Sequence, residues 1–413
     1  MSEYRIEKID KDFDGLVFNQ QNQAIKVPFT LKNELVAINK IDTTNNIGVA
    51  EKFSILEYSQ NRVAPICPYF SKCGGCKAQH FSKEDYLKQK MANLLHLLEV
   101  NQISYPKDIE IIHHHGDKKG YRRRVILSVM GKKLGFKAYR STNVVDIDFC
   151  PIATSNINKT LAVFKKIVAN YNHKMQVSEI TLSDIDGNID VLIKAKSKIN
   201  KEVLEAMPEA FAFPPIKKIT WNNEILIVKE EVSLNYGKYQ IPFSSGGFLQ
   251  PEKFGEEVLI NFAVNNLKNS TKVLDLFCGF GSYAFSLLDK GNIEKISLFD
   301  SSATAINALK KYSSSQVHVD IRDLFKNPLL ADFINNFNGI IINPPRSGAF
   351  AQVKEIAKSH VENLVMIYCS ATSIIRDCIV LKEREDLEIK QIKVLDQFIY
   401  SPHIEILIYF AKK

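Results

Sequence analysis

The sequence predicts an α/β fold in which a doubly wound, mostly parallel sheet follows a small β-barrel and a mixed α and β segment. After about residue 237, apolar strand runs alternate with helical stretches, as in a parallel sheet covered by helices on both faces. From residue 4 to about 57, apolar and polar residues alternate between turns, which is typical of the short strands of an OB-type barrel. The segment between them is a mixture of both patterns without an internal repeat. The predicted domains are therefore residues 1–58, 59–236 and 237–413.

Composition bounds the kind of protein. The chain has 413 residues, of which 45% are hydrophobic and 24% charged, so it can bury substantial cores. The first residues, MSEYRIEKIDKDFDG, are charged throughout, and no apolar stretch approaches the roughly 18 residues that would span a bilayer. We therefore expect neither export nor membrane insertion, and a cytoplasmic location.

The basic residues form two clusters. The net charge of +8, from 54 basic and 46 acidic residues, is modest. Two runs are strongly basic, however, one from His113 to Arg124 and one from Gly131 to Arg140. They include Tyr121, Phe136 and Tyr139, and the combination favours a nucleic acid as partner, because cations neutralise phosphates and aromatic rings stack on unpaired bases. A solvated hairpin surface, and a barrel without a ligand, are the alternatives.

A glycine-rich loop in the C-terminal part predicts a nucleotide-like ligand. The strand Val273–Leu276 runs directly into DLFCGFGS, where Gly279 and Gly281 allow a tight turn and the close approach of a ligand to backbone amides. The next strand ends in Asp300, whose carboxylate can accept the hydroxyl groups of a ribose. The third strand offers Asp320 and Asp323 near its end. A nicotinamide site is the alternative, and a packing role is expected for Cys278.

The cysteines indicate a metal site. An odd number of cysteines without a signal peptide argues against a disulfide framework. CPYFSKCGGC places Cys67, Cys73 and Cys76 on one loop, and Cys150 in VDIDFCPI could supply a fourth ligand. Four thiolates suit either a tetrahedral zinc ion or an iron–sulfur cluster, and ligand count does not separate the two. Three clustered ligands with one remote ligand resemble cluster ligation more than paired zinc ligands.

Taken with these motifs, the C-terminal segments INPPRSG, YCSATSIIRD and DQFIYSPHIEILIYF resemble those of the RNA 5-methyluridine methyltransferases. The resemblance is to the branch that carries a 4Fe-4S cluster and modifies 23S ribosomal RNA, and it covers nearly the whole chain. The N-terminal strands are similar to that family's TRAM barrel, CPYFSKCGGCKAQH and FCPI to its cluster ligands, and GYRRR to its basic segment. GGFLQP is similar to its Phe-x-Gln element and DLFCGFGS to its cofactor loop.

This resemblance implies a Rossmann-like class I methyltransferase domain that uses S-adenosylmethionine, a central iron–sulfur domain and RNA as substrate. We also expect the protein to be a monomer. The implied contacts to S-adenosylmethionine are Gln250, Phe277, Ser282, Asp300, Asp323 and Asn343, and the implied ligands of the 4Fe-4S cluster are Cys67, Cys73, Cys76 and Cys150. Cys369 becomes the nucleophile and Glu405 the general base. Carbon 5 of uracil attacks a sulfonium methyl group only after a thiolate has added to carbon 6, and a base must then remove the carbon 5 proton. The target base must be unpaired or flipped out of its stack.

The sequence departs from the family pattern at three places. Asn343 stands where the family usually has an aspartate, the residues after Cys369 are Ser370 and Ala371 instead of Asn-Pro, and Ile399 replaces a proline. An asparagine loses the charge and the purely accepting character of a carboxylate. We expect an active enzyme, with His403 as a packed residue and not as a helper of catalysis. An RNA-binding protein with weak or lost methylation, and a methyltransferase acting on transfer RNA, are the alternatives.

Overall fold

The computed structural model describes residues 2–43, 47–113 and 119–413. By their internal contacts the residues divide into two compact units. The first unit consists of Met1–His96, Phe136–Ile147 and Phe398–His403, and the second of Leu97–Gly135, Asp148–Gln397 and Ile404–Lys413. The three domains inferred from the sequence, with their boundaries, stay a prediction.

The first unit contains a six-stranded sheet in the order β1-β5-β6-β4-β3-β2. Its strands are β1 (Ser2–Arg5), β2 (Lys8–Ile9), β3 (Gly15–Phe18), β4 (Ala24–Val27), β5 (Leu35–Asp42) and β6 (Gly48–Glu57). β4 pairs parallel with β6, and the other neighbours are antiparallel. The alternating apolar residues, Val17, Val27 and Val36 among them, form one buried cluster on the inner face. The strands are where the alternation predicts them, and the OB-type or TRAM-type barrel stays a prediction.

The remainder of the first unit packs on aromatic contacts. Helix α1 (Lys83–Val100) begins here, and its buried Tyr86 lies 5.7 Å from Phe13, ring centre to ring centre. The Tyr86 hydroxyl accepts a hydrogen bond from the amide of Tyr400, so this helix anchors the segment Phe398–His403. The short strand β10 (Val144–Asp146) also belongs to this unit.

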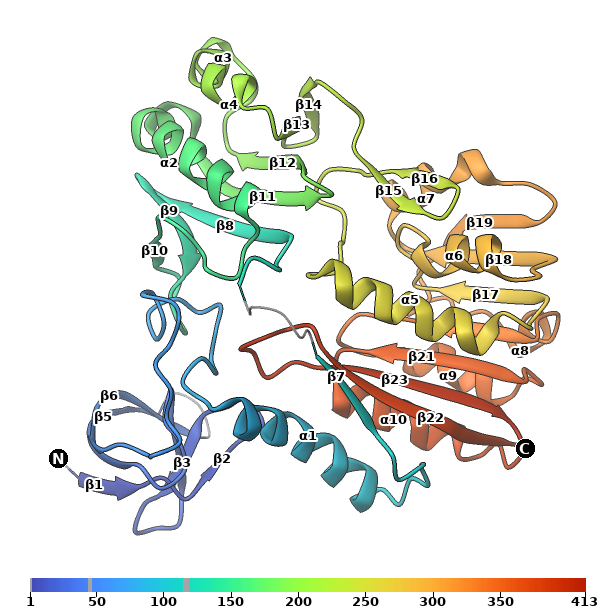
Figure 1. Cartoon of the computed structure of the whole chain (residues 1–413), viewed down its shortest axis with the longest axis horizontal. Coiled ribbons are helices and arrows are strands. Elements are labelled where there is room, and N and C mark those ends of the chain that lie inside the picture. Colours follow the sequence, from blue (N-terminus) through green and yellow to red (C-terminus); the bar gives the residue numbers. More distant parts are fainter. Residues whose placement is uncertain (1, 44–46, 114–118) are drawn as a thin grey trace. The chain divides into compact units, whose positions relative to one another are not determined.

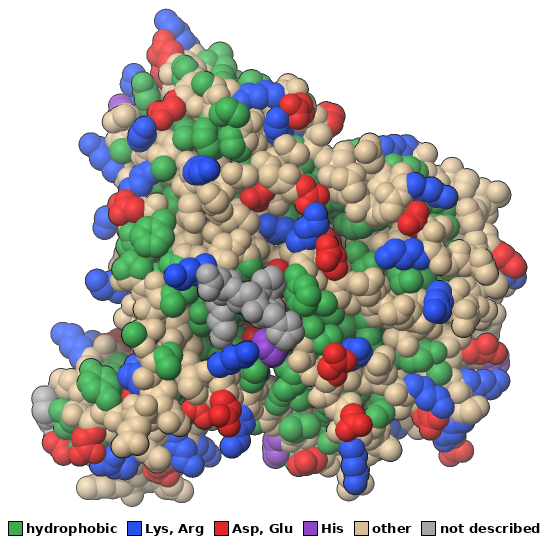
Figure 2. All heavy atoms as spheres, viewed as in Figure 1, with side chains coloured by type: hydrophobic (Ala, Val, Ile, Leu, Met, Phe, Trp, Pro, Cys, Tyr) green, Lys and Arg blue, Asp and Glu red, His purple; other side chains and the backbone are tan. Residues whose placement is uncertain are grey.

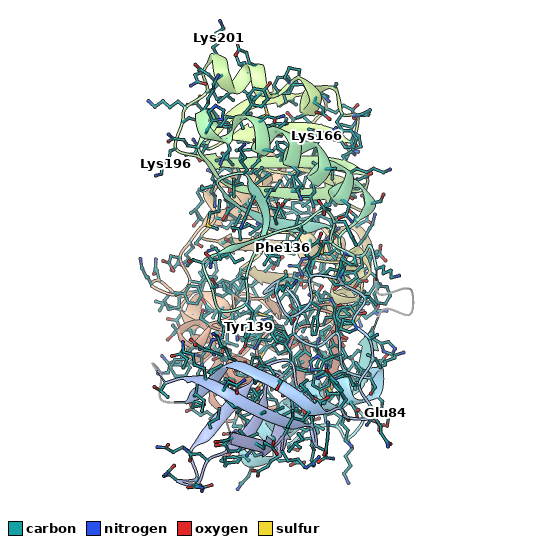
Figure 3. The ribbon with its side chains drawn as sticks, turned by 90° about the vertical axis from the view of Figure 1, so that its left-hand side faces the viewer. Glu84, Phe136, Tyr139, Lys166, Lys196 and Lys201 are labelled. Atoms are coloured by element: carbon teal, nitrogen blue, oxygen red, sulfur yellow. The ribbon has the colours of Figure 1, made fainter. Side chains whose placement is uncertain are left out.

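The second unit contains a mixed sheet with helices on one face. Its strands β8 (Arg124–Met130), β11 (Val177–Ile185), β12 (Asn188–Ala195), β13 (Ile216–Trp221) and β14 (Glu224–Val228) lie in that order, and β9 (Lys133–Lys137) pairs with β8. The long helix α2 (Ser155–Met175) lies along β11 in Figure 1, with α3 (Lys201–Ala206) and α4 (Pro208–Ala212) beside it. Leu161, Phe164 and Val168 of α2 are buried, whereas Lys166 and Lys201 project outward in Figure 3.

A small antiparallel ribbon follows in the chain. It consists of β15 (Ser233–Tyr236) and β16 (Tyr239–Pro242), and its buried Leu234 and Tyr236 join the main apolar cluster of the unit.

The second unit also contains the doubly wound sheet. Its eight strands lie in the order β19-β18-β17-β20-β21-β23-β22-β7. They are β17 (Lys272–Leu276), β18 (Lys295–Asp300), β19 (Val317–Ile321), β20 (Gly339–Ile342), β21 (Asn363–Tyr368), β22 (Leu387–Asp396), β23 (Glu405–Lys412) and β7 (Glu110–His113). The neighbouring pairs are parallel except those of β23, which is antiparallel to β21 and to β22. The mostly parallel α/β sheet predicted from the alternation is therefore confirmed.

Helices cover both faces of this sheet. The helices are α5 (Lys253–Leu267), α6 (Ser282–Lys290), α7 (Ala303–Leu309), α8 (Ala331–Ile334), α9 (Phe350–Ala357) and α10 (Ala371–Leu381), with a 3₁₀ turn η1 (Lys310–Tyr312) after α7. In Figure 1, α5 and α6 lie in front of the sheet, and α9 and α10 lie behind it. Strand residues such as Leu274, Ile341 and Val365 are fully buried between the two layers, which explains their unbroken apolar runs. No helix in the described ranges is long and apolar enough to cross a membrane.

Candidate active site

Cys369 and Glu405 lie side by side at one edge of the doubly wound sheet. Cys369 directly follows β21, and Glu405 is the first residue of β23. These strands pair antiparallel with Tyr368 opposite Ile406, so the next position along β21 adjoins the start of β23. The edge is the one where the parallel strands end, and ligands of such sheets bind there.

Burial controls the acidity of the Cys369 thiol. Burial raises the pKa of Cys369 to about 11, and the negative charge of Glu405 adds to the rise. The positive charge of Arg346 opposes it. The thiol is therefore protonated at neutral pH in the resting site. Cys278 and Cys378 are buried, and burial raises the pKa of both thiols, as expected of packing residues.

The loop after Cys369 is held without the proline of the family pattern. Ser370 caps α10 by accepting a hydrogen bond from the amide of Ser373 at 3.4 Å. The Ser373 hydroxyl donates in turn to the carbonyl oxygen of Arg346, at 2.6 Å. The cysteine loop and the INPPRSG loop are therefore tied together through side chains.

Glu405 is buried and accepts a hydrogen bond from an amide. It is 5% exposed, and Gln397 Nε2 donates to its Oε1 at 3.1 Å. The same nitrogen donates to Oε1 of Gln250 at 3.0 Å. Burial raises the pKa of Glu405 to about 8, and the hydrogen bond from Gln397 limits this rise. A carboxyl group with such a pKa can change its protonation state at neutral pH.

The glycine loop joins β17 to α6 with three residues in the left-handed region. Phe277, Gly279 and Gly281 have φ of 60°, 53° and 73°. A Cβ on Gly281 would lie 2.8 Å from the Phe285 ring, whereas one on Gly279 would meet nothing within 4 Å. The second glycine is therefore required by the helix packed beneath it, and the first leaves open space. Ser282 is the first residue of α6, so the N-terminus of this helix directly follows the loop.

Two carboxylates hold the loop. Asp300, at the end of β18, accepts hydrogen bonds from the amides of Gly279 (2.9 Å) and Ser302 (2.7 Å). Asp275 is fully buried, and its Oδ2 accepts from the amide of Ala284 at 3.2 Å, but its Oδ1 has no hydrogen-bond partner among the described residues. Burial raises the pKa of Asp275 to about 8, with a smaller effect of the Asp300 charge. A glycine loop at a helix N-terminus, bounded by two carboxylates, fits the ribose and amino-acid portions of S-adenosylmethionine.

Asn343 contacts helix α6. It follows β20, and its Nδ2 donates a hydrogen bond to the hydroxyl oxygen of Tyr283 at 2.8 Å. Tyr283 is buried, and its pKa is raised well above its usual value by burial and by the charge of Glu405. The asparagine thus acts as a donor toward the tyrosine, which an ionised aspartate cannot do.

Two aromatic rings flank the loop. The rings of Phe277 and Phe325 lie 5.3 Å apart. Asp323 accepts hydrogen bonds from the amides of Phe325 (3.1 Å) and Lys326 (3.3 Å). Phe277, Asp300, Asp323, Asn343 and Cys369 therefore all lie at or just beyond the carboxyl ends of successive strands.

Sequence reasoning missed Gln397 and Tyr283. Gln397 is the middle residue of the Asp396-x-Phe398 motif, and a polar residue after an apolar strand was the available signal. Tyr283 follows the glycine loop inside an apolar helix, where its spacing indicates only packing. His403 belongs to the first unit, and its ring lies 6.0 Å from that of Phe398 in an edge-on contact.

Three of the four predicted cluster ligands lie on one loop of the first unit, and Cys150 belongs to the second unit. The amide of Gly75 donates to Cys73 Sγ at 3.4 Å, and the amide of Gly74 donates to the carbonyl oxygen of Lys137 at 2.9 Å. Burial raises the pKa of Cys67, and two backbone amides oppose the rise. Amide donors to sulfur fit a thiolate ligand, of iron–sulfur or of zinc. In the part of the chain that the structure describes, no group of three or more His, Cys, Asp or Glu side chains is placed to hold a metal ion.

The basic clusters are partly structural. Residues 114–118 of the first run lie outside the described residues. Arg123 is buried, donates from Nε to the carbonyl oxygen of Gln250 at 2.9 Å and forms an ion pair with Glu256 at 2.7 Å. In the first unit, the Tyr139 hydroxyl (Figure 3) contacts the Asp14 carboxylate at 3.3 Å. Lys and Arg side chains are spread among acidic ones over the visible face in Figure 2.

Comparison with known proteins gives related chains along the whole length. Residues 253–366 match a family model described as "Methyltransferase small domain". A relative from Agrobacterium fabrum named "uncharacterized RNA methyltransferase" is 27% identical over 394 residues, which cover 92% of each chain. A relative from Mannheimia succiniciproducens, named "23S rRNA (uracil(1939)-C(5))-methyltransferase", is 26% identical over 435 residues, covering 100% of this chain and 96% of the relative.

A solved structure shares the fold over the whole chain. It is the tRNA (uracil-54, C5)-methyltransferase of Pyrococcus abyssi in complex with S-adenosyl-L-homocysteine, with a TM-score of 0.78 at 18% identity. The match covers 99% of this chain and 100% of that one. Together these comparisons confirm the predicted resemblance and the class I methyltransferase fold.

Proposed function

This chain is a relative of the RNA (uracil-5-)methyltransferases, and we propose that it methylates carbon 5 of a specific uridine in 23S ribosomal RNA. The observation that carries the proposal is the side-by-side position of Cys369 and Glu405 at the edge of the sheet that also holds the glycine loop. A nucleophile and a buried base beside a nucleotide cradle suit a reaction that forms and then breaks a covalent adduct. We also propose that the protein acts in the cytoplasm.

Cys369 starts the reaction. Its sulfur bonds to carbon 6 of the flipped uracil, and the electrons of the carbon 5–carbon 6 double bond move toward the oxygen on carbon 4. Because burial keeps the resting thiol protonated at neutral pH, its proton passes to a solvent water as the sulfur bonds to carbon 6. Arg346, whose charge lowers the pKa of Cys369, favours the thiolate.

S-adenosylmethionine, when bound, supplies the methyl group to carbon 5, and the sulfur–methyl electrons stay on the departing S-adenosylhomocysteine. Gln250, Phe277, Ser282, Asp300, Asp323 and Asn343 are the residues that we propose to hold it. Asp300 has spare lone pairs for ribose hydroxyls, and Phe277 and Phe325 offer faces for stacking against adenine.

Glu405 completes the reaction. As a carboxylate it takes the proton from carbon 5, the double bond between carbons 5 and 6 reforms, and the Cys369 sulfur leaves carbon 6. Its burial keeps the proton acceptor away from water, and the pKa of about 8 brings it near the working pH. The base therefore ends protonated and returns its proton to solvent after release of the product.

We also propose that Cys67, Cys73, Cys76 and Cys150 hold a 4Fe-4S cluster with a structural role. The amide donors at the sulfur atoms of Cys67 and Cys73 support thiolate ligands there. No step of the methylation uses the cluster, because the proton and the methyl group move without a change of redox state.

Transfer of a tritiated methyl group from S-adenosylmethionine to unmodified RNA tests the proposal. Recombinant protein should label 23S ribosomal RNA from a strain that lacks the gene, and digestion should return the label as 5-methyluridine. RNA binding without label would favour a binding protein of the same fold, and label in transfer RNA alone would favour the tRNA alternative. Mapping 5-methyluridine in both RNAs of the deletion strain locates the uridine.

A further inference from the structure

We infer that Gln397 is a positioning residue of the methylation reaction, holding the carboxylate of Glu405 and the amide of Gln250 in a fixed relation. This inference rests on the proposed function. Gln397 is fully buried, and its Nε2 donates to Oε1 of Glu405 at 3.1 Å and to Oε1 of Gln250 at 3.0 Å. One amide nitrogen thus joins the proposed base to a proposed cofactor contact.

The backbone brings Gln397 to this place. It directly follows β22, and Leu395 of β22 pairs with Glu405 of β23. The chain that leaves β22 therefore passes beside the first residue of β23. The amide nitrogen of Gln397 faces Glu405, where it can donate to the ionised carboxylate, and the amide oxygen faces away.

The amide oxygen of Gln397, Oε1, is buried without a hydrogen bond from any of the described residues. It faces Gly255 of α5, where a Cβ would lie 2.6 Å from Oε1. A buried carbonyl oxygen without a donor is unfavourable, and an apolar side chain of similar length would avoid it. The two hydrogen bonds from Nε2 are the contribution of the glutamine that an apolar side chain would lack.

The charged and titratable groups on the neighbouring elements do not stabilise the Glu405 carboxylate, whereas the Gln397 amide does. Tyr283 on α6 and the Cys369 thiol after β21 both feel the Glu405 charge, Asp396 ends β22, and Arg346 lies after β20 near the cysteine. Among the described residues no cation lowers the pKa of Glu405, and the hydrogen bond from Gln397 is what opposes the effect of burial. Without the Gln397 nitrogen, the carboxylate would be harder to ionise and free to turn away from carbon 5.

Slower proton removal has a visible signature. The Cys369–uracil bond breaks only after the carbon 5 proton has left, so a weaker base leaves the methylated RNA attached to the protein. A purely structural loss would instead lower binding and formation of the adduct together.

The test compares Gln397→Met with Gln391→Met in the full-length protein. Gln391 lies on the same strand β22, and its side chain accepts from Asn266 at 3.4 Å, away from Glu405. For Gln397→Met we expect the acidic limb of the pH profile of kcat to move up by roughly one pH unit. We also expect several-fold more covalent protein–RNA adduct on a denaturing gel at single turnover, and no change in either measurement for Gln391→Met.

Gly255→Ala tests the same contact from the other side. Its added methyl group would push the Gln397 amide out of place, while Gln397 and Glu405 themselves are not mutated. It should shift the pH limb in the same direction, and it remains informative should Gln397→Met fail to fold. An unshifted pH limb and unchanged adduct in the folded variants would overturn the inference while the wild-type activity stands. A wild-type protein that is inactive at every pH would overturn the proposed function instead.

Discussion

Cys369 and Glu405 adjoin because β23 runs antiparallel to β21, which places the start of one strand beside the end of the other. The charge of Glu405 raises the pKa of Cys369, so the two groups do not both ionise readily in the resting site. In the proposed reaction, Cys369 needs its proton removed before the adduct forms, and Glu405 needs its negative charge after the methyl group has been transferred. The pair therefore suits a reaction in which the negative charge on Cys369 is needed first and the negative charge on Glu405 later.

Replacing the nucleophile should abolish turnover. Cys369→Ala removes the sulfur that we propose to activate carbon 5, and methyl transfer should fall at least about a thousandfold, or ~4 kcal/mol in the activation barrier. Tritium transfer to RNA measures this loss. Cys378→Ala is the matched control, since that thiol is buried in α10 and should leave the rate within a few-fold of wild type. Equal losses in the two variants would contradict the assignment of Cys369.

Replacing the base should trap the adduct. Glu405→Gln keeps the shape of the side chain but cannot take the carbon 5 proton, so turnover should fall by about a hundredfold or more. The Cys369–uracil bond should still form, and a protein–RNA band should persist on a denaturing gel. The double variant with Cys369→Ala should show no band, and a band in that variant would mean that another residue forms the adduct.

The raised pKa of Glu405 also predicts how stability depends on pH. Its pKa is about 8 in the folded protein and about 4.5 when unfolded, so the folded state binds the proton more tightly. The stability that this group contributes is present at low pH and is lost as pH rises through about 8. Glutamine does not titrate, so the Glu405→Gln variant does not lose this contribution as pH rises. Its melting temperature minus that of the wild type should therefore increase between about pH 5 and pH 9. The pKa of buried Asp275 is also raised, so the wild type alone would not isolate the contribution of Glu405. The difference in melting temperature between the two proteins isolates it, because Asp275 is present in both. A constant difference would contradict a buried, titrating Glu405.

The sequence predicts the strands well because their signals are local. Unbroken apolar runs, such as that of β21, and a glycine loop after β17 need no knowledge of the partner strands. The same signals put Asp300 and Cys369 at strand ends, where the structure has them.

What the sequence does not predict depends on distant pairings. β7 joins the edge of the doubly wound sheet beside β22, although some 280 residues separate Ile112 from its partner Leu395. Similarly, the contact from Gln397 to Gln250 joins residues 147 positions apart. The hydrogen bond from Ser373 to the carbonyl oxygen of Arg346 ties the loop after Cys369 to another loop, and no local pattern reveals it. Side-chain ties between loops are found only once the sheet order is known.

The two glycines of the cofactor loop should respond differently to alanine. Gly281→Ala meets Phe285 and Leu298 and has a positive φ, so it should lower stability by about 2 kcal/mol or more. Gly279→Ala meets no atom within 4 Å, so only the cost of its positive φ, about 1–2 kcal/mol, should appear. Its methyl group would enter the space proposed for the ligand, and binding of S-adenosylhomocysteine should weaken at least about tenfold. Calorimetric titration and thermal melts separate the two effects, and unchanged binding by a folded Gly279→Ala would place the ligand elsewhere.

The four thiols predict a metal content that distinguishes a cluster from zinc. Protein purified without oxygen should contain about four iron atoms and four sulfides per chain if a 4Fe-4S cluster is present, and about one zinc ion otherwise. Cys67→Ser and Cys150→Ser should each lose the metal, because every ligand of such a centre is needed to complete it, whereas Cys378→Ala should retain it.

Ligands from residues 67–76 and from residue 150 would join segments remote in sequence, so loss of the metal should also lower the melting temperature. Methylation should survive in the metal-free protein at temperatures where it stays folded, since the steps proposed for Cys369 and Glu405 involve no electron transfer. Loss of activity in a folded, metal-free protein would show that the centre does more than hold these segments together.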